Sequence, residues 1–400
     1  MAVVSFEQVD IIFGNSPHKA LSLLDQGAQR EEILEKTGQV LGAADASLAI
    51  EEGEICVLMG LSGSGKSTLL RAVNGLNTVT RGHLFVEHQG QQIDVANCNS
   101  RTLRELRTGR IAMVFQQFAL LPWRTVRENV GLGLELKGVS KAQRKKVVDE
   151  KLELVGLSQW ADKYAHELSG GMQQRVGLAR AFATDADILL MDEPFSALDP
   201  LIRDKLQDEL LDLQRELKKT IIFVSHDLDE AMKIGSHIAI MEGGRIVQYG
   251  TPEAIVLAPE NDYVAEFVAH MNPLNVLKAS SLMRPAAELV RENGGNGDNG
   301  DNGHYRFGSF GEFQLSLHDN GEIAKVSVNG QPADWAEHSA GAPENTPQPG
   351  TFICAAPDTL MRTIIGLRQQ SGLPVLLTDR QQFTGIIGDD EIYRGLLRKP

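Results

Sequence analysis

The sequence predicts an α/β fold, in which helices cover both faces of a parallel sheet. Four short runs are apolar throughout instead of alternating, which is typical of strands that are buried on both sides. The runs are EICVLM at 54–59, IAMVF at 111–115, DILLM at 187–191 and TIIFVS at 220–225. Helical patterns lie between them, at 66–76 and 200–219, and Pro200 can take the first position of the second helix.

Composition limits the class of protein. The chain has 400 residues, of which 42% are hydrophobic and 23% charged, so it can fill a core and form two or three domains. Its net charge of −14 argues against broad affinity for nucleic acid or anionic lipid, since both are polyanions. Any binding of phosphate must therefore be local.

The cysteines and the N-terminus point to a reducing, cytosolic setting. Cys56, Cys98 and Cys354 are far apart and form no C-x-x-C pair, so neither a disulfide framework nor a zinc site is indicated. The first ten residues lack the basic and apolar regions of a secretory signal. The sequence also contains no apolar run of the roughly 18 residues that a membrane span needs. We expect neither standard secretion nor a membrane span.

The chain divides into three predicted regions. Residues 1–270 form the first, with a helical insertion at 16–41 between a strand ending near residue 13 and another around 46–50. Residues 271–350 contain two linker-like stretches, RENGGNGDNGDNG at 291–303 and SAGAPENTPQPG at 339–350. Residues 351–400 form a small separate α+β module, whose pattern from 357 onward is helix, strand, turn, strand, helix.

A glycine-rich segment predicts a phosphate site. GLSGSGKS at 60–67 matches G-x-x-x-x-G-K-[ST] and lies between a predicted strand and a predicted helix, which is the context this motif requires. Backbone N–H groups of such a loop bind phosphate oxygens, Lys66 adds a mobile positive charge, and the Ser67 hydroxyl can ligate Mg²⁺. The predicted binding residues are Gly60, Leu61, Ser62, Gly63, Ser64, Gly65, Lys66, Ser67 and Thr68.

Polar residues follow the other apolar strands, and the carboxyl ends of parallel strands share one edge of a sheet. Asp192 is placed to hold Mg²⁺ through water, and Glu193 to orient and deprotonate an attacking water. Gln116 could contact that water or Mg²⁺, and His226 could donate to a γ-phosphate. Taken singly, each of these residues could equally be an ordinary strand-end or loop residue.

LSGGMQQR at 168–175 predicts a second anion cradle. A serine cap followed by glycines leaves the N–H groups of a helix N-terminus available, here at Ser169, Gly170 and Gly171. The segment follows a helical stretch from residue 141 to about 155, so it belongs to a helical subdomain at about 123–183. The alternative to an anion cradle is that this segment is only the capped beginning of an ordinary helix.

With these motifs in this order, residues 1 to about 270 resemble the ATP-binding subunits of ABC transporters. SALD at 196–199 matches the D-loop of that family. The resemblance implies a P-loop NTPase fold of ABC type, with a parallel-sheet core, an antiparallel β subdomain and a helical subdomain. It also implies that Phe13 stacks on adenine and that Gln173 and Asp199 join the nucleotide site. Two subunits would pair head to tail. Each ATP would then lie between the glycine-rich loop (P-loop) at 60–67 of one subunit and the signature segment LSGGMQQR at 168–175 of its partner.

A narrower resemblance is to importers of quaternary amines such as choline, glycine betaine or proline betaine. It rests on the insertion at 16–41 and on VLMGLSGSGKSTLLRAVNGL, LLMDEPFSALDPLIR and IIFVSHDLDEAMKIG. LPWRTVREN and FVAHMNPLNVL are most similar to the choline members. The resemblance implies ATP and Mg²⁺ as cofactors, a homodimer on integral permease subunits, an extracytoplasmic solute-binding protein as indirect partner, and a peripheral position at the cytoplasmic face of the inner membrane.

The C-terminal module resembles half of a CBS pair, at about 351–398, where related subunits often have two. It could bind a regulator or serve for dimerisation and packing. Two other functions stay open. One is a soluble ABC ATPase acting on DNA or ribosomes, which the single cassette and the absence of zinc cysteines disfavour. The other is an importer ATPase for another solute, such as an amino acid or a sulfonate.

Overall fold

The protein was analysed as a computed structural model, which describes residues 2–269, 272–292, 301–308, 312–338 and 348–396. The chain divides into two compact units. Unit 1 comprises Met1–Ile255 and Pro259–Val268, and unit 2 comprises Val256–Ala258 and Ala269–Pro400. This division is geometric, and the predicted regions 1–270, 271–350 and 351–400 stay predictions. In the part of the chain that the structure describes, no helix is long and apolar enough to cross a membrane.

A six-stranded sheet forms the centre of unit 1, and its strand order is β10-β9-β3-β8-β7-β6. All neighbouring strands from β9 to β6 are parallel, and only the edge strand β10 runs antiparallel. Every residue of β3, β7 and β8 is buried, as their continuous apolar runs predict. The strands are β3 (Ile55–Met59), β6 (Ile111–Val114), β7 (Ile188–Asp192), β8 (Thr220–Val224), β9 (His237–Glu242) and β10 (Arg245–Gly250).

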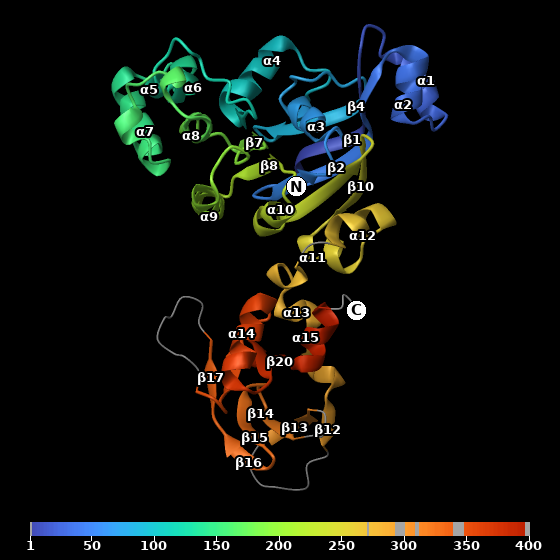
Figure 1. The fold of residues 1–400 in the computed structure, drawn as a ribbon, viewed down its shortest axis with the longest axis vertical. Helices are drawn as coiled ribbons and strands as arrows, with labels where there is room; N and C mark the ends of the chain where they lie inside the picture. The colour runs from blue at the N-terminus through green and yellow to red at the C-terminus, as the bar shows by residue number, and fades with distance from the viewer. Residues whose placement is uncertain (1, 270–271, 293–300, 309–311, 339–347, 397–400) are drawn as a thin grey trace. The chain divides into compact units, whose positions relative to one another are not determined.

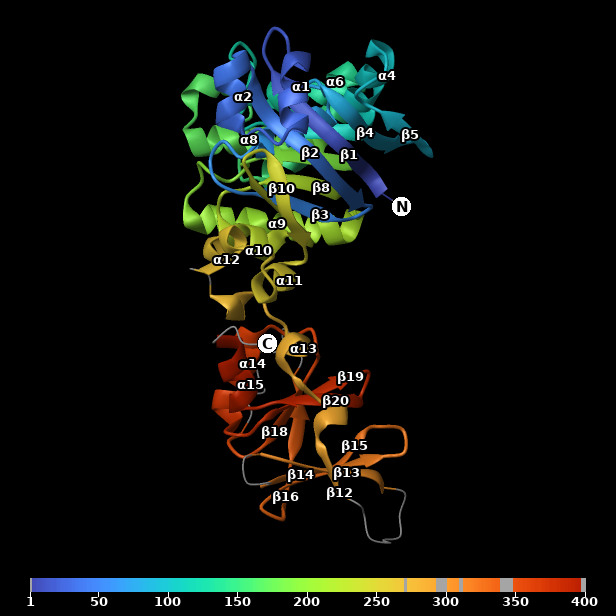
Figure 2. The ribbon, with the colours of Figure 1, turned by 90° about the vertical axis from the view of Figure 1, so that its right-hand side faces the viewer.

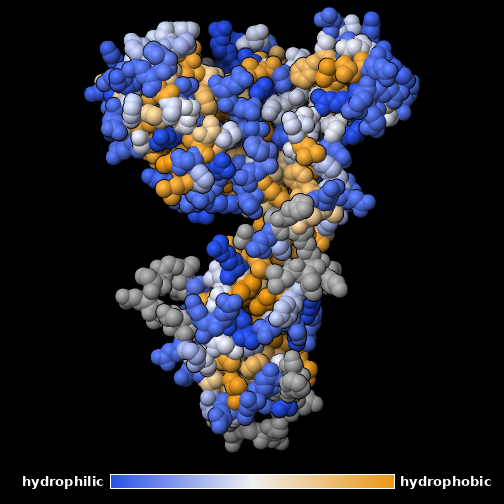
Figure 3. Space-filling view, viewed as in Figure 1, coloured by the Kyte–Doolittle hydropathy of each residue, from blue (hydrophilic) through white to orange (hydrophobic). Residues whose placement is uncertain are grey.

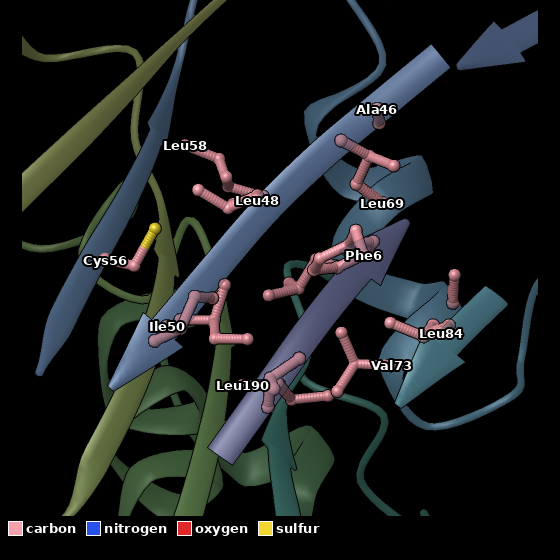
Figure 4. Packing of buried hydrophobic residues seen from close by; sticks show 14 of the residues in the cluster. Phe6, Ala46, Leu48, Ile50, Cys56, Leu58, Leu69, Val73, Leu84 and Leu190 are labelled. Atoms are coloured by element: carbon pink, nitrogen blue, oxygen red, sulfur yellow. The ribbon is translucent and has the colours of Figure 1, made fainter. Parts of the chain in front are cut away.

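A second sheet of unit 1 is antiparallel and has the order β2-β1-β4-β5. One hydrophobic core contains side chains from this sheet, from the parallel sheet and from helix α3, as Figure 4 shows for Phe6, Leu69 and Leu190. The two sheets and α3 therefore share one core. The elements are β1 (Ala2–Phe13), β2 (Val40–Glu51), β4 (Arg81–His88), β5 (Gln91–Asp94) and α3 (Lys66–Val73).

A helical subdomain projects from the parallel sheet of unit 1 (Figure 1). Side-chain caps set the beginnings of α5, α7 and α8: Thr125 forms a capping box with Glu128, and the hydroxyls of Ser140 and Ser169 accept the N–H group of the third residue of α7 and of α8. The predicted helix from residue 141 to about 155 is confirmed. The helices are α5 (Val126–Val130), α6 (Leu132–Leu136), α7 (Lys141–Leu154) and α8 (Gly170–Ala183).

Two short helices form the predicted insertion between β1 and β2. They are α1 (His18–Asp25) and α2 (Arg30–Thr37), and they have a small core of their own against the adjacent strands. The remaining helices of unit 1 include α9, which begins with Pro200 in its first turn as predicted. Their bounds are α4 (Ser100–Glu105), α9 (Pro200–Leu217), α10 (Leu228–Ile234) and α12 (Asp262–Ala269); α11 (Pro252–Leu257) lies at the division between the units.

Unit 2 contains the predicted order of helix, strand, turn, strand and helix, beginning with α14 (Figure 2). The two strands of this pattern, β19 and β20, belong to a five-stranded sheet of order β11-β20-β19-β18-β17. The pattern from residue 357 onward therefore accounts for only part of the sheet. The bounds are β11 (Arg284–Pro285), β17 (Trp335–Glu337), β18 (Phe352–Ala355), α14 (Met361–Ser371), β19 (Val375–Asp379), β20 (Gln382–Ile387) and α15 (Asp389–Leu396).

Residues 271–350, predicted as a linker and divergent accessory region, contain a second five-stranded sheet of unit 2 that the sequence pattern did not indicate. Its strands are short and half-polar, and only one face packs on the shared core around Leu315 and Phe352, so the alternation is weak in the sequence. Residues 293–300 and 339–347, in the two linker-like stretches, lie outside the described residues. The remaining elements are β12 (Val290–Glu292), β13 (Asp301–Phe307), β14 (Phe313–His318), β15 (Ile323–Val328), β16 (Gln331–Ala333) and α13 (Ala279–Leu282).

Candidate nucleotide site

The glycine-rich loop connects β3 to α3. Gly60, Gly63 and Gly65 have φ angles of 138°, 81° and 102°, a region that favours glycine. A Cβ on Gly60 would lie 2.1 Å from the carbonyl oxygen of Met241, and one on Gly65 would lie 2.4 Å from that of Gly42. The loop therefore needs glycine for two reasons: its backbone angles are positive in φ, and its backbone lies too close to neighbouring strands for a side chain.

Lys66 is buried inside this loop. Its Nζ donates to the carbonyl oxygens of Gly60 at 2.8 Å and Leu61 at 2.9 Å. Burial lowers the pKa of Lys66, and the nearby carboxylates of Glu193 and Asp192 partly offset that effect. The Ser64 hydroxyl is also buried and has no hydrogen-bond partner among the described residues. A buried ammonium and an unpaired hydroxyl suit a loop that takes a polar ligand such as phosphate.

Asp192, the last residue of β7, lies beside the first turn of α3. Ser67 Oγ donates to its Oδ1 at 2.7 Å, and Arg71 donates to its Oδ2 through Nε at 3.1 Å and Nη2 at 2.7 Å. Its side chain is fully buried. A hydroxyl and a carboxylate oxygen are hard ligands of the kind that Mg²⁺ prefers, so this pair fits the predicted metal site.

Two predicted residues, Gln116 and His226, lie beside one side-chain oxygen atom of a third, Oε2 of Glu193. Gln116 Nε2 donates to it at 3.1 Å, and His226 Nδ1 lies 3.4 Å from it. The three residues come from loops that follow β6, β7 and β8, which are neighbours in the parallel sheet. Glu193 itself has a φ of 48°, which is uncommon for a residue with a side chain. The structure thus brings these side chains together as strand register predicts, while their catalytic roles stay predictions.

The signature segment begins α8, with Ser169 as its cap. The Ser169 hydroxyl accepts from Met172 N at 3.4 Å, and Ser169 and Gly170 are exposed to solvent. In contrast, Gln173 Nε2 donates to the carbonyl oxygens of Ala165 and Leu168, so its amide group is already paired in this conformation. Among the described residues, no hydrogen bond or ion pair joins Ser169 to the glycine-rich loop of its own chain. Gly171 follows in the same first turn.

Asp199 and Phe13 lie at the edges of this region. Asp199 is the N-cap of α9, where its Oδ1 accepts from Ile202 N at 3.1 Å, and this local role explains its position without a ligand. Phe13 ends β1 and is 40% exposed beside a cavity of about 360 Å³. A Cβ on Gly42 would lie 2.6 Å from the Phe13 ring and 2.9 Å from the methyl group of Thr68. The ring therefore lies close to the helix that follows the loop.

Two residues that the sequence interpretation missed contact the predicted site residues Asp192 and Glu193. Arg71 binds Asp192, and its position one helical turn after Ser67 could have indicated this. Gln174 is 1% exposed; its Nε2 donates to the carbonyl of Glu193 and its Oε1 accepts from Ala197 N, both at 3.1 Å. Nothing in the local sequence distinguishes the buried Gln174 from its neighbour.

Comparison with known proteins identifies the family. The family model described as ABC transporter matches residues 43–196. The glycine betaine/proline betaine transport system ATP-binding protein ProV of Escherichia coli K12 is 52% identical over 285 residues, covering 71% of this chain and 70% of that protein. This chain belongs to the ABC transporter family of ATP-binding proteins. It is an ABC-type ATP hydrolase.

Other members support the same assignment. The glycine betaine transport ATP-binding protein OpuAA of Bacillus subtilis is 51% identical over 292 residues, covering 73% of this chain and 69% of that protein. The solved dimeric ABC cassette MJ0796 bound to ADP and Pi has a TM-score of 0.54 at 30% identity, covering 62% of this chain and 98% of the cassette. The predicted ABC-type P-loop fold is thereby confirmed. A second model, described as an AAA domain, putative AbiEii toxin, matches residues 161–232.

Proposed function

We propose that this ABC ATPase hydrolyses ATP with Mg²⁺ to power import of a quaternary amine such as glycine betaine, proline betaine or choline. The observation that carries the catalytic part is the meeting of Gln116 and His226 at Glu193 Oε2, beside the hydrogen bond between Ser67 and Asp192. Phosphate cradle, metal ligands and general base thus lie at the same edge of the parallel sheet.

Each residue has a distinct task in this proposal. The loop N–H groups and Lys66 bind the phosphates, and Phe13 stacks on the adenine ring. Ser67, Asp192 and Gln116 would hold Mg²⁺, whose charge offsets that of the triphosphate. Glu193 accepts a proton from the attacking water while the bond between the β- and γ-phosphates breaks, and His226 donates to the γ-phosphate.

The second cradle is proposed to act on a sister molecule. Ser169 and Gly170 are exposed, so the N-terminus of α8 is free to receive a phosphate that its own loop does not hold. Similarity to the dimeric MJ0796 cassette supports a homodimer. Nucleotide binding would then close the dimer and hydrolysis would release it, with Gly171, Gln173 and Asp199 at the shared site.

The surface beside the loop after β6 is proposed to bind a membrane-embedded permease subunit. A cavity of about 320 Å³ between the parallel sheet and the helical subdomain is lined by apolar residues including Leu76, Phe115 and Leu136. Leu136 is 68% exposed, and Figure 3 shows hydrophobic side chains on the surface near these helices. An apolar groove lined by Phe115, the residue before Gln116, would couple permease movement to the proposed catalytic turn. We propose that this docking holds the chain at the cytoplasmic face of the inner membrane, with a solute-binding protein as indirect partner.

The choice of solute is supported by the relatives. Proteins named for glycine betaine, proline betaine or carnitine transport are 50–52% identical, whereas a methionine import protein of Geobacillus kaustophilus is 44% identical over 58% of this chain. The relatives named for transport and the net charge of −14 weigh against a soluble ATPase acting on nucleic acid. Choline as the preferred solute stays a prediction from the segments at 121–129 and 267–277.

Uptake in whole cells tests this function. A strain lacking the chain is given back the wild type or the Glu193→Gln variant, and uptake of radiolabelled glycine betaine, proline betaine, choline and methionine is measured. We expect the wild type, and not the variant, to restore uptake of at least one quaternary amine while methionine uptake is unchanged. Restoration of methionine uptake alone would overturn the solute assignment.

A further inference from the structure

The helical insertion contacts the glycine-rich loop through a residue outside the motif. Arg30, the first residue of α2, donates from Nη1 to the carbonyl oxygen of Gly63. The same nitrogen would lie 3.8 Å from a Cβ on Gly63, so the guanidinium group lies directly beside the middle of the loop. An inserted helix thus supplies a cation to the phosphate cradle.

Packing holds α2, and with it Arg30, against the strands of unit 1. Ile33 of α2 is fully buried and Leu24 of α1 is nearly so, in the small core that the insertion forms with β1 and β2. Arg81 of β4 bridges Asp25 at the end of α1 and Asp10 of β1. The insertion is therefore packed against the rest of unit 1, and this packing holds Arg30 near Gly63.

The contact restrains one peptide group of the loop. In a trans peptide the C=O and the following N–H point in opposite directions. The N–H of Ser64 donates to the carbonyl of Leu61 at 3.1 Å, and the carbonyl of Gly63, at the other end of the same peptide, accepts from Arg30. Both ends of this peptide are thus bound, although Gly63 is a residue whose backbone is otherwise permissive.

Two cations hold the loop's carbonyl oxygens from different elements. Lys66 donates to Gly60 and Leu61 from within the loop, whereas Arg30 donates to Gly63 from the insertion. A carbonyl oxygen that is paired with a cation has part of its negative potential offset, so it repels an incoming phosphate less.

We propose that Arg30 is a positioning residue of the nucleotide site, which sets the peptide between Gly63 and Ser64 and adds positive charge beside the phosphates. The proposal rests on the function proposed for residues 60–67. In the described part of the chain, Arg30 forms no hydrogen bond or ion pair with Glu193, Gln116 or His226. Arg30 therefore determines how tightly nucleotide binds and leaves the chemical step unchanged.

Variants of the full-length chain test this role. We expect Arg30→Ala to raise the Kd for fluorescent ATP and ADP analogues, and the KM for ATP, roughly five- to tenfold, with kcat within about twofold of the wild type. Arg30→Lys should recover part of the affinity, since an ammonium can donate to the same carbonyl. Lys36→Ala is the matched control, because Lys36 lies on the same helix and forms an ion pair with Glu32, away from the glycine-rich loop. It should bind nucleotide as the wild type does.

Several results would overturn the proposal. Unchanged nucleotide affinity in Arg30→Ala would contradict it and leave the site at residues 60–67 intact. A fall in kcat at unchanged Kd would assign Arg30 to the chemical step instead. An equal loss of affinity in Lys36→Ala, or a lowered Tm that accounts for the loss, would make the effect one of helix stability. A wild-type chain that bound no nucleotide would overturn this proposal and the proposed function together.

Discussion

Gln174 donates a 3.1 Å hydrogen bond from its side-chain amide to the carbonyl oxygen of Glu193. Gln174 lies on the helix that the signature Ser169 caps, whereas Glu193 is the proposed general base for the chain's own nucleotide. The second bond of this amide, from Ala197 N to Oε1, holds the turn that follows Glu193. A single buried side chain thus connects the proposed cradle for a partner's ATP with the turn of the proposed general base.

We expect Gln174→Leu to lower kcat roughly tenfold or more while KM for ATP changes little. Loss of the amide frees the backbone of Glu193, whose φ of 48° costs on the order of 1 kcal/mol and needs support from its surroundings. Steady-state ATPase assays check this. Gln248→Leu is the control. Gln248 lies in the edge strand β10, is also buried, and accepts a backbone N–H from Glu260. Equal losses in both variants would mean general destabilisation.

Glu193→Gln should bind ATP but hydrolyse it roughly 100- to 10,000-fold more slowly, because an amide cannot accept the proton of the attacking water. The variant keeps an oxygen that can accept from Gln116, so the local geometry survives. ATP should therefore hold it as a closed dimer, which size-exclusion chromatography with and without ATP would detect. ATPase activity close to the wild type would refute the role of Glu193.

Mixing two inactive variants tests whether Ser169 acts on the partner's nucleotide. Lys66→Ala disables the loop, and Ser169→Asp keeps a good helix cap while its charge repels phosphate. In a mixed dimer, one site combines the intact loop of one chain with the intact signature of the other. We expect ATPase activity to reappear on mixing. If Ser169 acted within its own chain, every site in the mixed dimer would have a defect and no activity would return.

Glu230 predicts a pH dependence of stability. Burial raises the pKa of its carboxyl, and hydrogen bonds from Ser225 and Gln207 offset only part of that shift. The folded state thus binds this proton more tightly than the unfolded state does. The contribution of Glu230 to stability therefore falls as pH rises from its ordinary pKa of 4.5 through the folded value.

Glu230→Gln removes this titration and keeps an acceptor for Gln207. Relative to the wild type, the variant should gain in Tm as pH rises through that interval and then hold a constant advantage. Thermal unfolding of both proteins between about pH 4.5 and 8 measures the difference, in which the effects of other groups cancel. Parallel curves, or a gain at low pH, would contradict the direction of the pKa shift.

Sequence register predicted the proximity of Gln116, Glu193 and His226, because each follows a continuous apolar strand and such strands align in a parallel sheet. The glycine-rich loop was likewise readable, since its positive φ angles need glycine at fixed spacing. In unit 2, short strands around 284–285 and 335–337 escaped prediction, as two or three residues carry almost no periodicity.

The sequence by itself thus determined the α/β class of unit 1 and the residue types of the proposed nucleotide site, because backbone conformation and strand period act over a few neighbouring residues. Only the tertiary structure decided that Gln174 supports Glu193 and that Arg30 holds Gly63. These contacts join residues 19 and 33 positions apart in the chain. Their partners are backbone carbonyl oxygens, which every residue has, so no residue type in the sequence marks them.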